Sequence, residues 1–187
     1  MPSPIDFYFD FSSPYGYFAA ERIDDLAARH GRAVIWHPIL LGVVFKVVGT
    51  APLPSIPVKG PYSLHDIQRS ARYHGLPYAH PQPFPIATQH AGRTFTWLAE
   101  HSAAQAREFA LAAYRAYFTA GRDISDLGAV LEIAGGLGVD ADELSAALAG
   151  DVLKARFKAD VEAALAQGVF GSPFFIVDGE PFWGSDR

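Results

Sequence analysis

The sequence contains no cysteine, and this absence removes several kinds of chemistry at once. A chain without cysteine forms no disulfide, offers no thiolate ligand to a metal and has no cysteine nucleophile. Its one methionine, Met1, carries the only sulfur atom of the 187 residues. Any thiol chemistry at this protein therefore depends on a thiol that a bound molecule supplies.

Long hydrophobic runs and an excess of positive charge are also missing. No apolar stretch reaches the ~18 residues that a membrane-crossing helix needs, and no basic segment of a secretory signal precedes the strand-like PIDFYFDF. The formal net charge of −5 argues against nucleic acid, because phosphate binding needs a basic surface. With 50% hydrophobic and 19% charged residues, we expect a soluble, cytoplasmic, globular protein without a membrane or nucleic-acid partner.

The motifs of other enzyme classes do not occur either. The seven histidines form no H-E-x-x-H or similar ligand spacing, so no metal site is expected. No G-x-S-x-G is present, which leaves a hydrolase serine elbow without support. The GGLG at 135–138 follows a helical stretch, whereas a phosphate-binding loop follows a strand.

The N-terminal segment predicts a βαβ unit. Residues 5–11 alternate with a period of two, which is typical of a strand. Pro14 suits the first position of a helix and makes Ser13 the N-cap. The helix should end at Gly31, after basic residues in its last turn, and a second strand follows at 33–39. Such a unit pairs its two strands in parallel through a right-handed crossover.

Helices and loops fill the middle of the chain, and strands return at the end. Two proline-rich loops flank a short helix, and helices are then predicted at 93–103, 105–120, 125–137, 140–149 and 151–167. Two short strands, 174–177 and 181–183, enclose an Asp178-Gly179 hairpin turn. The fold class is thus α/β, a thioredoxin-like fold with a large all-helical insertion. Its thioredoxin-like domain would comprise 1–39 and 169–187, and the insertion domain 40–168.

Five stretches, FDFSSPYGY, WHPILLGVVFK, KGPY, GVFGSPFF and FWGSDR, together resemble the 2-hydroxychromene-2-carboxylate isomerases. These are relatives of kappa-class glutathione transferases and of the DsbA-type thioredoxin fold. The likeness runs along essentially the whole chain in one order. It implies glutathione as the cofactor, a small aromatic carboxylate as the substrate and a homodimer. The implied reaction interconverts 2-hydroxychromene-2-carboxylate and trans-o-hydroxybenzylidenepyruvate in aromatic hydrocarbon catabolism.

Ser13 is the catalytic candidate. Thioredoxin-like redox proteins carry Cys-x-x-Cys where this chain has Ser13-Pro14-Tyr15-Gly16. A helix N-terminus favours an anion, and a serine hydroxyl there can donate a hydrogen bond to a bound thiolate. Such a bond contributes on the order of 1.5–3 kcal/mol, or about one to two pKa units. Our hypothesis is that Ser13 stabilises the thiolate of glutathione; in the alternative, Ser13 only caps the helix and Ser12 is a neighbour.

The resemblance also implies residues that hold glutathione. A cis Ser172-Pro173 bond would expose the backbone of Ser172 to the tripeptide, which then binds like an added strand. Ser185, after Gly184, would hold the γ-glutamyl carboxylate, with Asp186 facing its ammonium, and the loop residue Lys59 would point to the glycyl carboxylate. Thr50 stands where the family commonly has asparagine, so one hydrogen bond to glutathione is lost or replaced. An ordinary helix cap and a solvated lysine are the alternatives.

A pocket for the second substrate is expected between the serine end of the sheet and the helical block. Its candidate lining residues are Tyr15, Phe45, Tyr78, Phe84 and Trp183. Lys46 or Arg69 could supply donors to the substrate carboxylate and a developing enolate. Two other functions stay open at this point: a kappa-like glutathione transferase or peroxidase, and a non-catalytic thioredoxin-like binding module.

Overall fold

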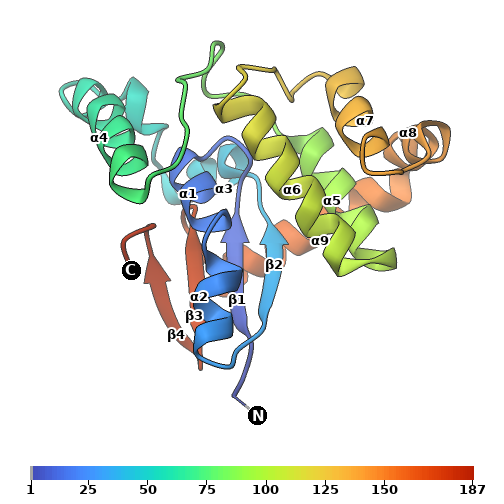
Figure 1. The fold of residues 1–187 in the computed structure, drawn as a ribbon, viewed down its shortest axis with the longest axis horizontal. Coiled ribbons are helices and arrows are strands. Elements are labelled where there is room, and N and C mark those ends of the chain that lie inside the picture. Colours follow the sequence, from blue (N-terminus) through green and yellow to red (C-terminus); the bar gives the residue numbers. More distant parts are fainter. Residues whose placement is uncertain (1) are drawn as a thin grey trace.

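The computed structural model describes residues 2–187 and begins with the predicted βαβ unit (Figure 1). Its elements are β1 (Ile5–Phe9), α1 (Pro14–Ala20), α2 (Ile23–Arg29) and β2 (Val34–Pro38). Strands β1 and β2 pair in parallel, and Gly31 ends α2 with a left-handed φ of 65°. The unit is confirmed, and its strands are slightly shorter than expected.

The helix expected between these strands is interrupted and forms α1 and α2. Arg22 leaves helical geometry with a φ of −134°, although neither glycine nor proline marks the break. The neighbouring Glu21 side chain accepts two hydrogen bonds, both 2.6 Å long, from Arg115. The break therefore coincides with a contact from a distant part of the chain, which local sequence rules do not reveal.

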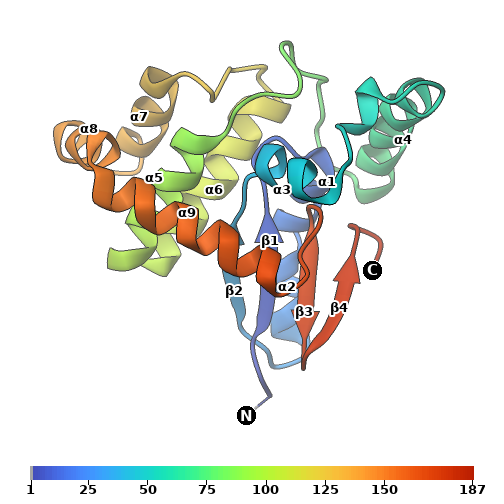
Figure 2. The ribbon, with the colours of Figure 1, turned by 180° about the vertical axis from the view of Figure 1, so that it is seen from behind.

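The C-terminal hairpin completes one mixed sheet of four strands in the order β2-β1-β3-β4. Strands β3 (Phe174–Val177) and β4 (Glu180–Trp183) enclose Asp178 and Gly179, whose positive φ angles of 52° and 85° suit the predicted tight turn. Strand β3 runs antiparallel to β1. Helices α1 and α2 cover one face of the sheet, and α9 (Asp151–Ala166) crosses the other (Figure 2).

The segment between β2 and β3 is helical apart from its loops. Besides α9 it contains α3 (Leu41–Val48), a short 3₁₀ helix (Leu53–Ser55), α4 (Lys59–His74), α5 (Gln89–His101), α6 (Ala103–Phe118), α7 (Leu127–Gly135) and α8 (Ala141–Ala149). The helix between the two proline-rich loops was expected to be short, and this was wrong. The helix found there, α4, has 16 residues and begins at Lys59, inside the first of those loops. Pro61 is compatible with this earlier start, because it lies in the first turn, where its missing N–H has no partner within the helix.

A large hydrophobic cluster joins the sheet to the helices, and a smaller one, which includes Tyr8, Val44 and Ala164, lies between the sheet, α3 and α9. Phe9 at the end of β1 meets Phe95 of α5 at a ring-centroid distance of 5.3 Å, and Phe11 meets Phe109 of α6 at 6.1 Å. These contacts hold the helical block against the carboxyl end of β1, beside Ser13. No helix within residues 2–187 has both the length and the apolar character needed to cross a bilayer.

Candidate active site

A cavity of about 1120 Å³ lies where β1 ends and α1 begins. Its walls come from the N-terminus of α1, from α3, from α4, from the segment before α5 and from the C-terminal residues 183–187. Ser12, Ser13 and Asp10 lie at the junction of these walls. The cavity therefore surrounds the position that the sequence indicates for thiol chemistry.

Ser13 is the N-cap of α1, as predicted, and is 4% exposed. Its Oγ accepts a hydrogen bond from the Gly16 N–H (3.0 Å) and donates one to the Ser172 carbonyl (2.9 Å). The single proton of this hydroxyl is thus held by Ser172. Because a hydroxyl hydrogen rotates about its C–O bond, the same proton can be directed to another acceptor in the cavity.

Ser12 also lines the cavity and is 7% exposed. Its Oγ accepts a hydrogen bond from the Ile86 N–H (3.1 Å), while its own N–H donates to Asp10 Oδ1 (2.7 Å). Among residues 2–187 we find no acceptor for the Ser12 hydroxyl proton. The site therefore offers two serine hydroxyls, of which only Ser13 also caps the helix.

Asp10, which the sequence analysis did not single out, joins three walls of the cavity. Its carboxylate is 2% exposed and accepts hydrogen bonds from the Ser12 N–H, from the Leu41 N–H at the start of α3 (2.6 Å) and from the Thr88 hydroxyl (3.1 Å). Burial raises the pKa of this carboxyl to about 6, because desolvation outweighs the three donors. Asp10 thus fixes the serine loop to α3 and to the segment before α5.

The raised pKa of Asp10 predicts an unusual pH dependence of stability. A folded protein that binds this proton more tightly than the unfolded chain gains stability as the pH falls through about 6. Between pH 7 and pH 5 the difference in unfolding free energy between the wild type and Asp10→Asn should shift by about 1 kcal/mol in favour of the wild type. Urea unfolding at both pH values measures it, and a difference that stays constant would contradict an ionised, buried Asp10 at pH 7.

Gly16 lets the first turn of α1 approach the floor of the cavity. A Cβ atom there would lie 2.7 Å from the Tyr114 hydroxyl and 2.9 Å from Ser172 Oγ. Both groups are hydrogen-bonded to the backbone of Asp10. The Tyr114 hydroxyl donates to the Asp10 carbonyl (2.9 Å), and the Asp10 N–H donates to Ser172 Oγ (3.0 Å). The peptide bond between Ser172 and Pro173 is cis, as the resemblance implies. Glycine at position 16 therefore keeps Ser13 and Ser172 in contact.

Most residues predicted for the site lie together in this cavity. Those that line it are Ser12, Ser13, Tyr15, Phe45, Lys46, Thr50, Phe84, Ser172, Pro173, Trp183, Gly184, Ser185 and Asp186. Tyr78 does not line it, because its ring stacks on Phe118 in the core at 5.8 Å. Lys59 begins α4 and also lies outside the lining. Arg69 pairs with Asp66 at 3.1 Å and does not line it either.

Sequence reasoning missed Asp10, Asp66 and Thr88, which all line the cavity. For Asp10 a signal was available: it is a charged residue in the aromatic run FYFDF, directly before the two serines. Asp66 and Thr88 carry no such signal, since their roles depend on contacts with residues about fifty or more positions away in the chain.

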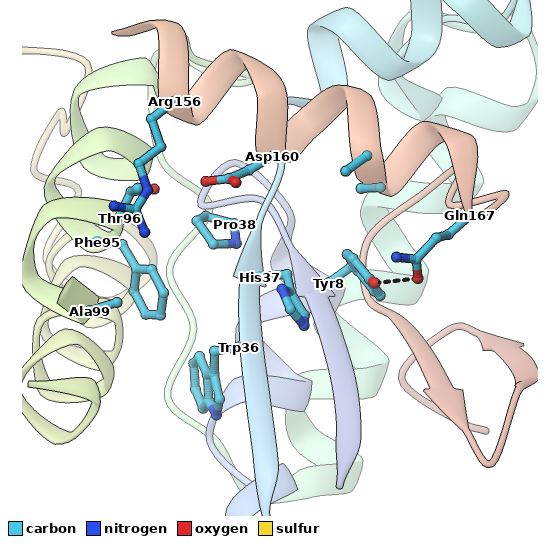
Figure 3. Close-up of a pocket in the computed structure, with 12 residues that line it drawn as sticks. Tyr8, Trp36, His37, Pro38, Phe95, Thr96, Ala99, Arg156, Asp160 and Gln167 are labelled. Atoms are coloured by element: carbon cyan, nitrogen blue, oxygen red, sulfur yellow. Dashed lines mark hydrogen bonds between the residues drawn. The ribbon is translucent and has the colours of Figure 1, made fainter. Parts of the chain in front are cut away.

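A second, smaller cavity of about 350 Å³ lies between β2, α5 and α9 and shares no residue with the first (Figure 3). Tyr8 donates a hydrogen bond to Gln167 there (2.9 Å), and His37 lies 2.8 Å from Asp6. None of the site residues predicted from the sequence lines it. The chemistry expected at Ser13 therefore belongs to the first cavity.

Comparisons with known proteins identify the family of the chain. The family model of the DSBA-like thioredoxin domain matches residues 4–187. A 2-hydroxychromene-2-carboxylate isomerase of Sphingobium xenophagum is 32% identical, with 100% of this chain and 95% of that protein covered. Glutathione s-transferase kappa 2 of Caenorhabditis elegans is 27% identical over 98% of this chain and 87% of its own. A solved 2-hydroxychromene-2-carboxylate isomerase superposes with a TM-score of 0.87 at 28% identity, covering 98% and 89% of the two chains.

Proposed function

The chain belongs to the family of DSBA-like thioredoxin domains and to that of the 2-hydroxychromene-2-carboxylate isomerases, and we propose that it is a glutathione-dependent isomerase. Its reaction would interconvert 2-hydroxychromene-2-carboxylate and trans-o-hydroxybenzylidenepyruvate. The observation that carries the proposal is the Ser13 hydroxyl, which caps α1 inside a large cavity of a protein that has no cysteine. We also propose a homodimer, which the resemblance to this family implies.

The polar groups of the cavity suit glutathione, which has two carboxylates and an ammonium group. Lys46 and Arg187 line the cavity as cations, and the Asp186 carboxylate lines it near Arg187, 3.3 Å away. These charges complement those of the tripeptide. Lys59, at the first turn of α4, does not line the cavity. It would contact the glycyl carboxylate only if that end of glutathione reached beyond the residues that line the cavity. Thr50 offers a hydroxyl in place of the family's asparagine amide.

The Ser172 backbone would hold the tripeptide by strand-like pairing. The Ser172 carbonyl can accept a peptide N–H of the ligand, and the Ser13 hydroxyl can rotate its proton from that carbonyl toward the sulfur. Ser13 then stabilises the thiolate together with the N-terminus of α1. Bound glutathione supplies a nucleophilic thiolate, whose reversible addition makes a conjugated double bond single and free to rotate.

Isomerisation by this protein is expected to depend on the thiol of glutathione. Protein free of glutathione should form the trans product only at the uncatalysed rate, and added glutathione should restore its formation, which the absorbance of that product measures. S-methylglutathione is the matched control: it keeps the charges and the peptide but lacks the thiol, so it should bind and inhibit. Equal rates with and without glutathione would exclude the cofactor role.

A glutathione transferase of the kappa type is the second candidate, supported by the similarity to kappa 2 of Caenorhabditis elegans over nearly the whole chain. Turnover of a chloronitrobenzene with glutathione, without isomerisation of the chromene, would favour it. A non-catalytic binding module is distinguished by calorimetry, because a protein that has lost the site binds no glutathione.

A further inference from the structure

Tyr15 and Asp66 form a second polar centre in the cavity that contains Ser13. The Tyr15 hydroxyl donates a hydrogen bond of 2.7 Å to Asp66 Oδ2, which links the first turn of α1 to α4. Both residues line the cavity, so the pair is open to a bound molecule. Asp66 is held from its other side by Arg69, at 3.1 Å from Oδ1. The Tyr15 oxygen, whose own proton is held by Asp66, can therefore accept a hydrogen bond from a ligand.

We propose that Tyr15 and Asp66 are the proton relay for a hydroxylated aromatic substrate: Tyr15 touches the substrate oxygen and is the catalytic residue, and Asp66 acts through it as the positioning residue. This inference rests on the proposed function, in which the substrate is a cyclic hemiketal. Opening that ring requires a proton to leave one oxygen and another oxygen to be protonated, a step in which thiol addition takes no part.

The relay balances without any added reactant. The hemiketal O–H bond breaks as its proton passes to the Tyr15 oxygen, while the Tyr15 proton passes to Asp66 Oδ2. The electron pair left on the hemiketal oxygen forms the keto C=O bond, and the ring C–O bond breaks with its pair on the aryl oxygen. Asp66 then returns the proton through Tyr15 to that oxygen, which becomes a phenol. One proton has moved between two substrate oxygens.

The surroundings of Tyr15 suit a group that passes a proton and does not stay ionised. Burial, and secondly the hydrogen bond to Asp66, raise the pKa of Tyr15 well above its ordinary value. The charge of Asp66 and, more weakly, Tyr62 and Tyr78 raise this pKa further, while Arg69 contacts only the far oxygen of Asp66. Tyr15 thus remains protonated at neutral pH and is ready to exchange its proton with Asp66.

The test separates the relay from thiol chemistry and from a merely structural link. In glutathione-free protein, bound trans-o-hydroxybenzylidenepyruvate is titrated by its phenolate absorbance. D66N removes the carboxylate that disfavours a phenolate, and Y15F removes the oxygen that accepts the phenol proton and so favours the neutral phenol. Each variant should therefore lower the midpoint of the bound phenol by about one pH unit. Y17F is the matched control, since the Tyr17 hydroxyl is bound to Pro77 O (3.0 Å) outside the cavity lining, and it should leave the midpoint unchanged.

Kinetics give the second readout. With glutathione present, Y15F and D66N should reduce kcat for the chromene about 100-fold, the usual size of general acid–base catalysis. The cis–trans isomerisation of benzylidenepyruvate, which lacks the hydroxyl, should change less than about twofold, because that step needs no relay. Equal losses on both substrates, an unmoved phenol midpoint, or a loss of glutathione affinity would each overturn the relay. Activity without glutathione would sink the proposed function and leave the phenol titration as an independent test of the pair.

Discussion

Ser13→Ala is expected to raise the pKa of the bound glutathione thiol by about one to two units. The variant removes the one hydroxyl that both caps α1 and can turn its proton toward the cavity. A thiol with an ordinary pKa of about 8.5 is then mostly protonated at neutral pH, so kcat at pH 7 should fall about 10- to 100-fold. Titration of the thiolate by its ultraviolet absorbance in the complex measures the shift.

Two variants control for other effects of that substitution. Ser102→Ala removes a comparable N-cap, since Ser102 accepts from the Gln105 N–H (3.2 Å) at the start of α6 and does not line the cavity. It should cost about 1 kcal/mol of stability and leave the thiol pKa unchanged. Ser12→Ala tests the neighbouring hydroxyl. If this variant shifts the pKa while Ser13→Ala does not, the role belongs to Ser12 and our assignment is contradicted.

Phe157→Ala should lower the free energy of unfolding by about 3–5 kcal/mol, the largest stability effect that we expect. The ring is 2% exposed, in the middle of α9, and lies directly over Gly92 of α5. A Cβ atom at position 92 would overlap this ring, so Gly92→Ala should also destabilise, by about 1–3 kcal/mol. Denaturant unfolding measures both changes.

The double variant Gly92→Ala with Phe157→Ala gives the sharper result. The added methyl group enters the space left by the ring, so the double variant should be less destabilised than the sum of the single variants. Val152→Ala, on α9 but 85% exposed, should change stability by less than about 0.5 kcal/mol. Strict additivity, or a loss below about 1 kcal/mol for Phe157→Ala, would contradict the contact between α5 and α9.

Features fixed by neighbours in the chain could be predicted from the sequence. Ser13 before Pro14 indicated the start of α1, and Asp178-Gly179 indicated the hairpin turn, because each depends on the geometry of a few consecutive residues. The mixed sheet followed from the order of strands and helices and from the resemblance. The type of each element was thus well specified, while the ends of several helices were not.

Features that depend on distant contacts could not be predicted in this way. The break between α1 and α2 coincides with Arg115 binding Glu21, 94 positions earlier in the chain. Asp10 reaches Thr88 across 78 positions, and Tyr15 reaches Asp66 across 51. Tyr78 was expected in the pocket, but aromatic stacking in the core holds it elsewhere. Residue type alone does not distinguish a lining aromatic from a core aromatic, since both are apolar and partly buried.

A crystal structure of the glutathione complex tests the central claim most directly. We expect the sulfur atom within hydrogen-bonding distance of Ser13 Oγ at the N-terminus of α1, and the cysteinyl backbone paired with Ser172. A cavity without the tripeptide at saturating concentration, or a sulfur atom that lies away from Ser13, would contradict the account.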